Sequence, residues 1–217
     1  MSGTKTHGKR VDSSARVNRW LKDATVNLFS YDPGHHIYRE NDEVGAVFKV
    51  VRGLVLTTQP FTRSNYELSD KCACVCGPGD TFGGLFGDEM YTEDAIAFVK
   101  TQVQTYRLEG MPCEVLLPMA QEAARNQRET TAVVHGGSVR TRVARTLALL
   151  CRKYFCANGG VVSVTHQTLA ELIVSRRESV TRVLNELEMR EYITLERASV
   201  VVRDVIALEN IIHYEFD

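Results

Sequence analysis

Between Leu28 and Leu108 the apolar residues form short runs, several of which alternate with polar positions. Alternation with a period of two is typical of β-strands, because successive side chains point to opposite faces of the sheet. Arg52-Gly53 is expected to close a hairpin between residues 47–51 and 54–58. Many short strands at regular spacing predict an antiparallel roll or barrel.

The pattern then changes to intervals of three and four residues, which is the spacing of one helix face. This helix is expected to begin near Met111-Pro112, since proline is tolerated in a first turn, and to end at His135-Gly136-Gly137. One face forms a heptad-like seam of six residues. These are Leu116, Ala120, Ala123, Gln127, Thr130 and Val134.

An arginine-rich amphipathic segment extends from Ser138 to Tyr154. Arg140, Arg142 and Arg145 are expected on its exposed face, where a solvated face and a phosphate contact are both open readings. A strand at residues 161–164, a strand pair at 192–195 and 199–202, and a short helix near 205–212 complete the predicted elements.

Two short helical patterns meet across a tight break within residues 165–190. We expect Thr165 to cap the first helix and Ser175 the second, because a hydroxyl at this position accepts from unpaired backbone amides. A short helix, a turn and a second helix with a polar leading face form the helix-turn-helix pattern.

The polar face of the second helix carries chemistry suited to DNA. Arg177 and Arg182 could each present a planar guanidinium to guanine O6 and N7, and Glu178 could accept from cytosine N4. The alternative is an ordinary surface, on which Glu178 and Arg182 pair across one helical turn. The pattern alone leaves both readings open.

The run Ser175-Arg176-Arg177-Glu178-Ser179-Val180-Thr181-Arg182-Val183-Leu184 resembles the recognition helix of the CRP/FNR family of bacterial transcription regulators. The resemblance extends through Ile193 and Val200–Val202, reaches back to Gly79–Gly83, and covers most of residues 28–208. It implies an α+β fold with an antiparallel β-roll, similar to cyclic-nucleotide-binding domains, a dimerisation helix and a C-terminal winged helix-turn-helix. The expected domains are a flexible basic arm (1–25), the β-roll effector domain (26–110), the dimerisation helix and hinge (111–137) and the DNA-binding domain (138–217).

By this resemblance Arg177, Glu178 and Arg182 read the bases of CRP-type GTGA half-sites. Residues implied at the DNA phosphates are Thr165, His166, Gln167, Ser175, Arg176 and Ser179. The seam over residues 116–134 is expected at the interface of a homodimer, since an inverted-repeat operator requires a two-fold protein. RNA polymerase is the expected partner if the regulator activates transcription.

The predicted β-roll departs from the family where cyclic nucleotides bind. The family places a glutamate after Phe-x-Gly and an arginine before a later strand, and these positions fall at Gly84 and near Ala95. Four carboxylates precede that strand, and they would repel a phosphate that the family holds with an arginine. They are Asp88, Glu89, Glu93 and Asp94. We expect no response to cAMP, and the effector and cofactor stay unknown.

Cys72, Cys74 and Cys76 alternate along one predicted strand, so their thiols should share one face. Two readings remain open. The cysteines could pack as small hydrophobes. Alternatively, together with Cys113, they could hold a metal or an iron–sulfur cluster, or sense redox state. The fumarate-nitrate branch of the family holds such a cluster with N-terminal cysteines, but residues 1–27 contain no cysteine.

The net charge of −1 divides unevenly along the chain. Lys and Arg number six against two Asp and Glu in residues 1–25, nine against fifteen in 26–137, and eleven against ten in 138–217. A near-neutral, arginine-rich C-terminal part can bind DNA if one sign of charge faces the duplex.

Several classes of protein are excluded by what the sequence lacks. No apolar run approaches the roughly 18 residues of a membrane span, and the N-terminus has no secretory h-region. The six unevenly spaced cysteines indicate thiols or metal ligands, without a disulfide framework. No hydrolase triad, HExxH, P-loop or GxGxxG pattern occurs, so we expect a cytoplasmic protein that is not an enzyme and does not contact membrane.

Overall fold

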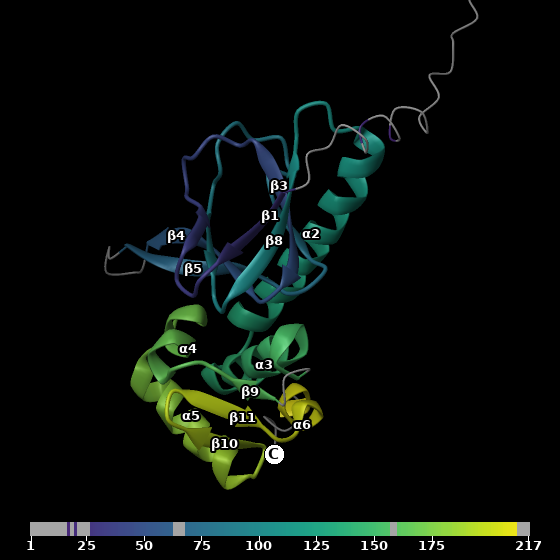
Figure 1. Ribbon diagram of the computed structural model, residues 1–217. Helices are drawn as coiled ribbons and strands as arrows, with labels where there is room; N and C mark the ends of the chain where they lie inside the picture. Colours follow the sequence, from purple (N-terminus) through teal and green to yellow (C-terminus); the bar gives the residue numbers. More distant parts are fainter. Residues whose placement is uncertain (1–16, 18–19, 21–26, 63–67, 157–159, 212–217) are drawn as a thin grey trace, which may run out of the picture.

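The computed structural model describes residues 17, 20, 27–62, 68–156 and 160–211. Strands form the upper part of the molecule, a long helix runs down from them, and a smaller group of helices and strands lies below (Figure 1). The strands of the upper part are β1 (Asn27–Tyr31), β2 (His36–Tyr38), β3 (Ala46–Arg52), β4 (Val55–Thr62), β5 (Leu68–Cys76), β6 (Thr81–Gly83), β7 (Asp94–Ala97) and β8 (Thr101–Arg107).

These strands form two four-stranded antiparallel sheets, in the orders β1-β8-β3-β6 and β2-β7-β4-β5. Their facing side chains enclose one core, in which the rings of Tyr38 and Tyr91 stack at 3.8 Å and those of Phe48 and Phe82 at 5.3 Å. The predicted antiparallel roll is therefore confirmed.

The expected hairpin at Arg52-Gly53 is wrong. β3 pairs with β8 and β6, whereas β4 pairs with β5 and β7, so the chain changes sheets at this corner. Gly53 has φ +97°, and a Cβ there would lie 2.4 Å from Thr101 Oγ1. The corner therefore requires glycine, for its left-handed backbone and for the close approach of Thr101.

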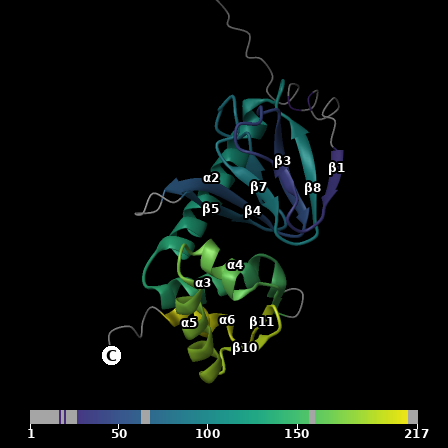
Figure 2. The ribbon, with the colours of Figure 1, turned by 90° about the vertical axis from the view of Figure 1, so that its left-hand side faces the viewer.

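Helix α2 (Cys113–His135) packs along β5 and β6 and leads from the roll to the C-terminal elements (Figure 2). It ends at Gly136, as predicted. The helix directs the six seam residues toward its own protomer. Ala123, Thr130 and Val134 are buried there, Leu116 and Ala120 pack around the Val47–Leu85 cluster, and Gln127 lines a cavity in the roll.

In this structure the buried members of the seam contact the chain's own roll, and the role of the seam as a dimer interface stays a prediction. Spacing of three and four residues describes any apolar helix face, whether it meets a sheet or a second helix. Thr130 illustrates the intramolecular role, since its hydroxyl accepts a 3.2 Å hydrogen bond from Val75 N in β5.

The C-terminal elements are α3 (Val139–Leu150), a π-helical turn η1 (Cys151–Phe155), β9 (Val161–Val162), α4 (His166–Leu172), α5 (Arg177–Met189), β10 (Ile193–Glu196), β11 (Ser199–Val202) and α6 (Val205–Glu209). β10 and β11 form the expected antiparallel wing, with β9 as the third strand. Thr165 caps α4, because its hydroxyl accepts from Thr168 N at 3.0 Å.

Ser175 does not cap α5, contrary to expectation. The N-cap of α5 is Arg176, which makes no side-chain capping bond. Val174, which comes directly before Ser175, has φ +51°. This left-handed conformation is unfavourable for a β-branched residue. Ser175 N instead donates to Ala170 O at 2.8 Å, which closes the tight turn between the two helices.

Cys151 and Cys156 form a disulfide across the π-helical turn, with Cα atoms 4.7 Å apart. The expectation of free thiols is wrong for this pair. A π-helical turn joins residue i to residue i+5, so it brings Cys156 N to Cys151 O as well as the two sulfurs together.

The expected basic arm over residues 1–25 lies outside the described residues, apart from Val17 and Trp20. Both are helical, and the Trp20 ring lies 6.4 Å from the Tyr106 ring in a stacked arrangement, with Trp20 buried. None of the described helices is long and apolar enough to cross a membrane.

Candidate nucleic-acid interface and adjacent cavity

Helix α5 has one face buried in the core and another face exposed to solvent. Val180, Leu184 and Leu187 have no exposed surface and seat the helix in the core that it shares with α3 and α4. Arg177, Glu178 and Arg182 are exposed. They line one open groove, which is completed by Thr181, Asn185 and Met189.

The six residues expected at phosphates surround the leading ends of α4 and α5. Thr165, Gln167 and Arg176 are exposed, whereas His166, Ser175 and Ser179 are half-buried. His166 Nδ1 lies 2.9 Å from Thr181 Oγ1, so this side chain also ties α4 to α5. Gln167 Nε2 donates to Glu171 Oε1 at 2.7 Å.

Two arginines expected on an exposed face instead hold the helices together. Arg140 pairs with Glu186 of α5 at 3.1 Å, and Arg142 Nη1 donates to Ile173 O at 3.0 Å. Ile173 is the C-cap residue of α4, so Arg142 satisfies a helix-end carbonyl. The sequence placed these arginines outside the apolar stripe of Val143, Leu147 and Leu150, but such a pattern does not identify partners on other helices.

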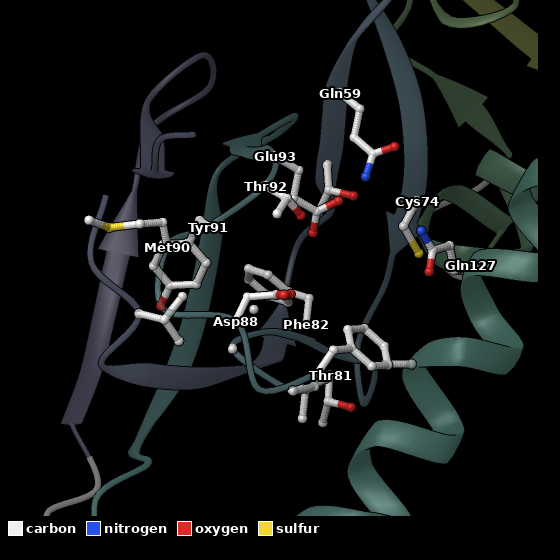
Figure 3. A pocket seen from close by; sticks show the side chains of 17 residues that line it. Gln59, Cys74, Thr81, Phe82, Asp88, Met90, Tyr91, Thr92, Glu93 and Gln127 are labelled. Atoms are coloured by element: carbon white, nitrogen blue, oxygen red, sulfur yellow. The ribbon is translucent and has the colours of Figure 1, made fainter. Parts of the chain in front are cut away.

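A cavity of about 220 Å³ opens between the two sheets and α2. Figure 3 shows Cys74 and Gln127 on its α2 side, Met90 and Tyr91 on the opposite side, and Glu93 beside Gln59. Gly84 also lines it. None of the described lining residues is lysine, arginine or histidine, and Glu93 and Asp88 are its acidic members.

Glu93 is held in place by the aromatic core. Tyr38 donates its hydroxyl to Glu93 Oε1 at 3.1 Å. Burial raises the pKa of the Glu93 carboxyl, and the nearby Thr57 and Tyr38 hydroxyls offset part of that rise. The carboxyl therefore takes up a proton at higher pH than a solvated glutamate does.

The strand cysteines are buried and do not gather into one site. Cys74 and Cys76 lie in the core between the sheets with sulfurs 3.6 Å apart, Cys72 belongs to the other core cluster, and Cys113 is exposed on α2. Burial raises the pKa of the Cys72 thiol, and the Cys74 contact together with burial raises that of Cys76. Both thiols stay protonated, which disfavours metal binding and oxidation.

No group of three or more His, Cys, Asp or Glu able to hold a metal ion occurs in the described ranges. The cysteine geometry therefore fits packing better than an iron–sulfur or zinc site, because such sites need converging thiolates.

A polar network joins the roll to the C-terminal helices. Lys153 of η1 donates to Asp80 Oδ2 at 2.8 Å and to Asn126 Oδ1 at 2.7 Å. Asn126 Nδ2 in turn donates to Cys74 Sγ at 3.2 Å and to Val75 O at 3.1 Å. The sequence offered no signal for this network, because its members come from four distant elements.

Replacing Lys153 by methionine is expected to destabilise the protein by about 1–3 kcal/mol, because it removes two charged hydrogen bonds, one to Asp80 and one to Asn126. Thermal unfolding should show a Tm lowered by several degrees. The control is Arg152→Ala, whose exposed pair with Glu209 should contribute less than about 1 kcal/mol. Equal shifts in the two variants would contradict a structural role for Lys153.

Comparison with known proteins finds one matching family model and many related regulators. Residues 141–211 match the model of the Crp-like helix-turn-helix domain. The transcriptional regulator LdrP of Thermus thermophilus is 34% identical over 181 residues, which cover 80% of this chain and 90% of LdrP. A CRP-like cAMP-activated global transcriptional regulator of Mycobacterium tuberculosis is 24% identical over 79% of this chain and 81% of its own length.

Solved structures agree in fold. The crystal structure of a CRP-family transcriptional regulator from Thermus thermophilus has a TM-score of 0.68 and 27% identity, over 84% of this chain and 95% of that one. FixK2 from Bradyrhizobium japonicum has a TM-score of 0.67 at 21% identity, over 85% of this chain and 96% of its own.

Proposed function

This chain belongs to the CRP family of transcriptional regulators and is not an enzyme, and from this premise we propose that it is a cytoplasmic homodimer reading an inverted-repeat operator. The observation that carries the proposal is the division of α5 between a buried apolar stripe and an exposed polar face. Such a helix can enter the major groove without loss of its own packing.

Arg177, Glu178 and Arg182 are the proposed base-reading residues. They lie in one groove with Thr181 and Asn185, so several polar side chains can meet consecutive base edges. Arginine matches guanine O6 and N7, and glutamate accepts from cytosine N4. We propose GTGA-like half-sites on this basis, together with the family resemblance of the same three residues.

The proposed phosphate contacts are the exposed and half-buried polar groups at the starts of α4 and α5, which orient the reading helix on the duplex. They are Thr165, His166, Gln167, Ser175, Arg176 and Ser179. His166 would do so while bonded to Thr181, so its contact would come from the ring edge that faces away from Thr181.

The dimer contact is proposed on the outward face of α2, since the inward face is occupied by the chain's own roll. Leu117 is 58% exposed on this face. Gln121, Arg125, Arg128 and Ala132 are exposed at the following turns. RNA polymerase is the proposed partner where the bound dimer activates transcription.

A direct test is operator binding by fluorescence anisotropy, with a GTGA-type inverted repeat and a duplex of scrambled half-sites. We expect tighter binding to the inverted repeat, and a log-affinity that falls linearly with log salt as phosphates are neutralised. Sedimentation should give a dimer on one operator. Equal affinity for both duplexes would refute sequence-specific reading.

We also propose that cAMP is not the effector. At Gly84, where cyclic-nucleotide binders of the family carry glutamate, a Cβ would lie 2.3 Å from Val44 Cγ1 and 2.6 Å from Leu108 Cδ1. The carboxylate of Glu93 lines the cavity, where a phosphate would need a cation.

Gly84→Glu is therefore expected to confer no cAMP binding by calorimetry and to lower stability by about 1–3 kcal/mol through overpacking. Gly45→Glu is the matched control, because a Cβ at Gly45 meets no atom within 4 Å. Micromolar cAMP binding by the wild type or by Gly84→Glu would contradict this account.

A further inference from the structure

The charged side chains that line the cavity between the sheets and α2 are all acidic. Glu93 and Asp88 are acidic, and the other described lining residues are neutral. Three aromatic residues, Phe82, Phe86 and Tyr91, line the same cavity as these carboxylates, and Figure 3 labels Phe82 and Tyr91 among them. Carboxylates combined with aromatic faces attract cations, through ion pairing and through the ring quadrupole.

A second observation at the same cavity indicates an unmet partner. Thr57 is only 1% exposed and lines the cavity, and although its hydroxyl is near enough to the Glu93 carboxylate to lower the pKa of that group, it makes no hydrogen bond of ordinary length to any described residue. Buried hydroxyls are almost always bonded in folded proteins, so such a group inside a cavity marks a place for a ligand atom or water. Gln59 and Gln127 also line the cavity and add amide oxygens.

We propose that this cavity binds a small organic cation that carries a primary ammonium or a guanidinium group. Glu93 pairs with the cationic head, and the Thr57 hydroxyl and the amides of Gln59 and Gln127 bond its remaining donors. Glu93 is positioned for this by its hydrogen bond from Tyr38, which fixes the carboxylate without neutralising it.

The volume limits the ligand further. The cavity volume of about 220 Å³ is less than the ~300 Å³ where drug-sized pockets begin. The ligand is therefore a short aliphatic amine or guanidine and not a nucleotide. It would contact Ala123 and Gln127 of α2, and α2 is the helix that leads to the DNA-binding elements.

The inference deepens the proposed regulatory function, but its test reads ligand binding alone, so its failure would leave operator binding standing. The full chain is titrated with agmatine, 1,4-diaminobutane and methylguanidine, with 1,4-butanediol and succinate as neutral and anionic counterparts. At least one cation is expected to raise the Tm by about 2 °C or more, and the rise should grow with concentration by mass action.

Glu93→Gln preserves the shape of the side chain and is expected to abolish the shift, and Thr57→Val to reduce it. Glu89→Gln is the matched control, because Glu89 is exposed in the same loop and does not line the cavity. The inference is overturned if no cation shifts the wild type, if succinate or butanediol shifts it as much, or if Glu93→Gln responds like the wild type.

Discussion

Replacing Arg182 by alanine is expected to weaken operator binding by about 1–3 kcal/mol, or roughly 5- to 150-fold, and to relax base preference at one operator position. Arg182 is exposed at the centre of the polar face of α5, one turn after Glu178. A guanidinium that bonds guanine O6 and N7 together loses both bonds on truncation. Anisotropy titrations on operators substituted at each position would measure the loss and locate it.

The matched control is Arg190→Ala. Arg190 is also exposed and adjoins α5, but it is the C-cap residue and pairs with Glu186 at 3.6 Å, away from the leading end. Its replacement should change affinity little. Arg176→Ala should instead weaken operator and scrambled duplex alike and reduce the salt slope by about one. If Arg182→Ala behaved like Arg176→Ala, Arg182 would contact phosphate and not a base.

Leu184→Ala is expected to lower the free energy of unfolding by about 2–5 kcal/mol, which is the range for large-to-small changes in a packed core. Leu184 has no exposed surface and lies in the cluster that holds α3, α4 and α5 together. Urea denaturation followed by circular dichroism would measure the change. The molecules that stay folded should keep the operator affinity of the wild type.

Met189→Ala serves as the comparison on the same helix, because Met189 is 78% exposed. A surface substitution of this kind should alter stability by less than about 0.5 kcal/mol. Similar effects of the two substitutions would show that the α5 stripe does not seat the helix as described.

Local patterns predicted the elements that are built from local interactions. Alternation along residues 28–108 predicted strands, and the paired helical stripes over residues 165–190 predicted α4 and α5, because side-chain period reports which face is buried. The cap at Thr165 followed from the same local chemistry. The three base-reading candidates lie together because they are close in sequence along one helix.

Features that depend on distant contacts could not be predicted in this way. The stripe of α2 gives the same spacing whether it meets a roll or a second helix, so the spacing alone does not show that Thr130 and Val134 are buried within the chain. The sheet change at Gly53 depends on the closeness of Thr101. Arg142 and Lys153 have partners that lie 31 and 73 residues away in sequence, and the Cys151–Cys156 bond depends on a π-helical turn with no clear sequence signal.

The contact from Cys74 through Asn126 to Lys153 has a thermodynamic consequence for the whole regulator. Cys74 lines the cavity and Lys153 belongs to the DNA-binding half, so two hydrogen bonds span the distance between ligand and operator elements. Coupling between two binding sites is reciprocal: if an occupant of the cavity changes operator affinity by some factor, the operator changes the occupant's affinity by the same factor. Promoter-bound and free molecules of the regulator would then retain such an occupant for different times, so the number of operators in the cell would influence the occupant concentration at which the response occurs.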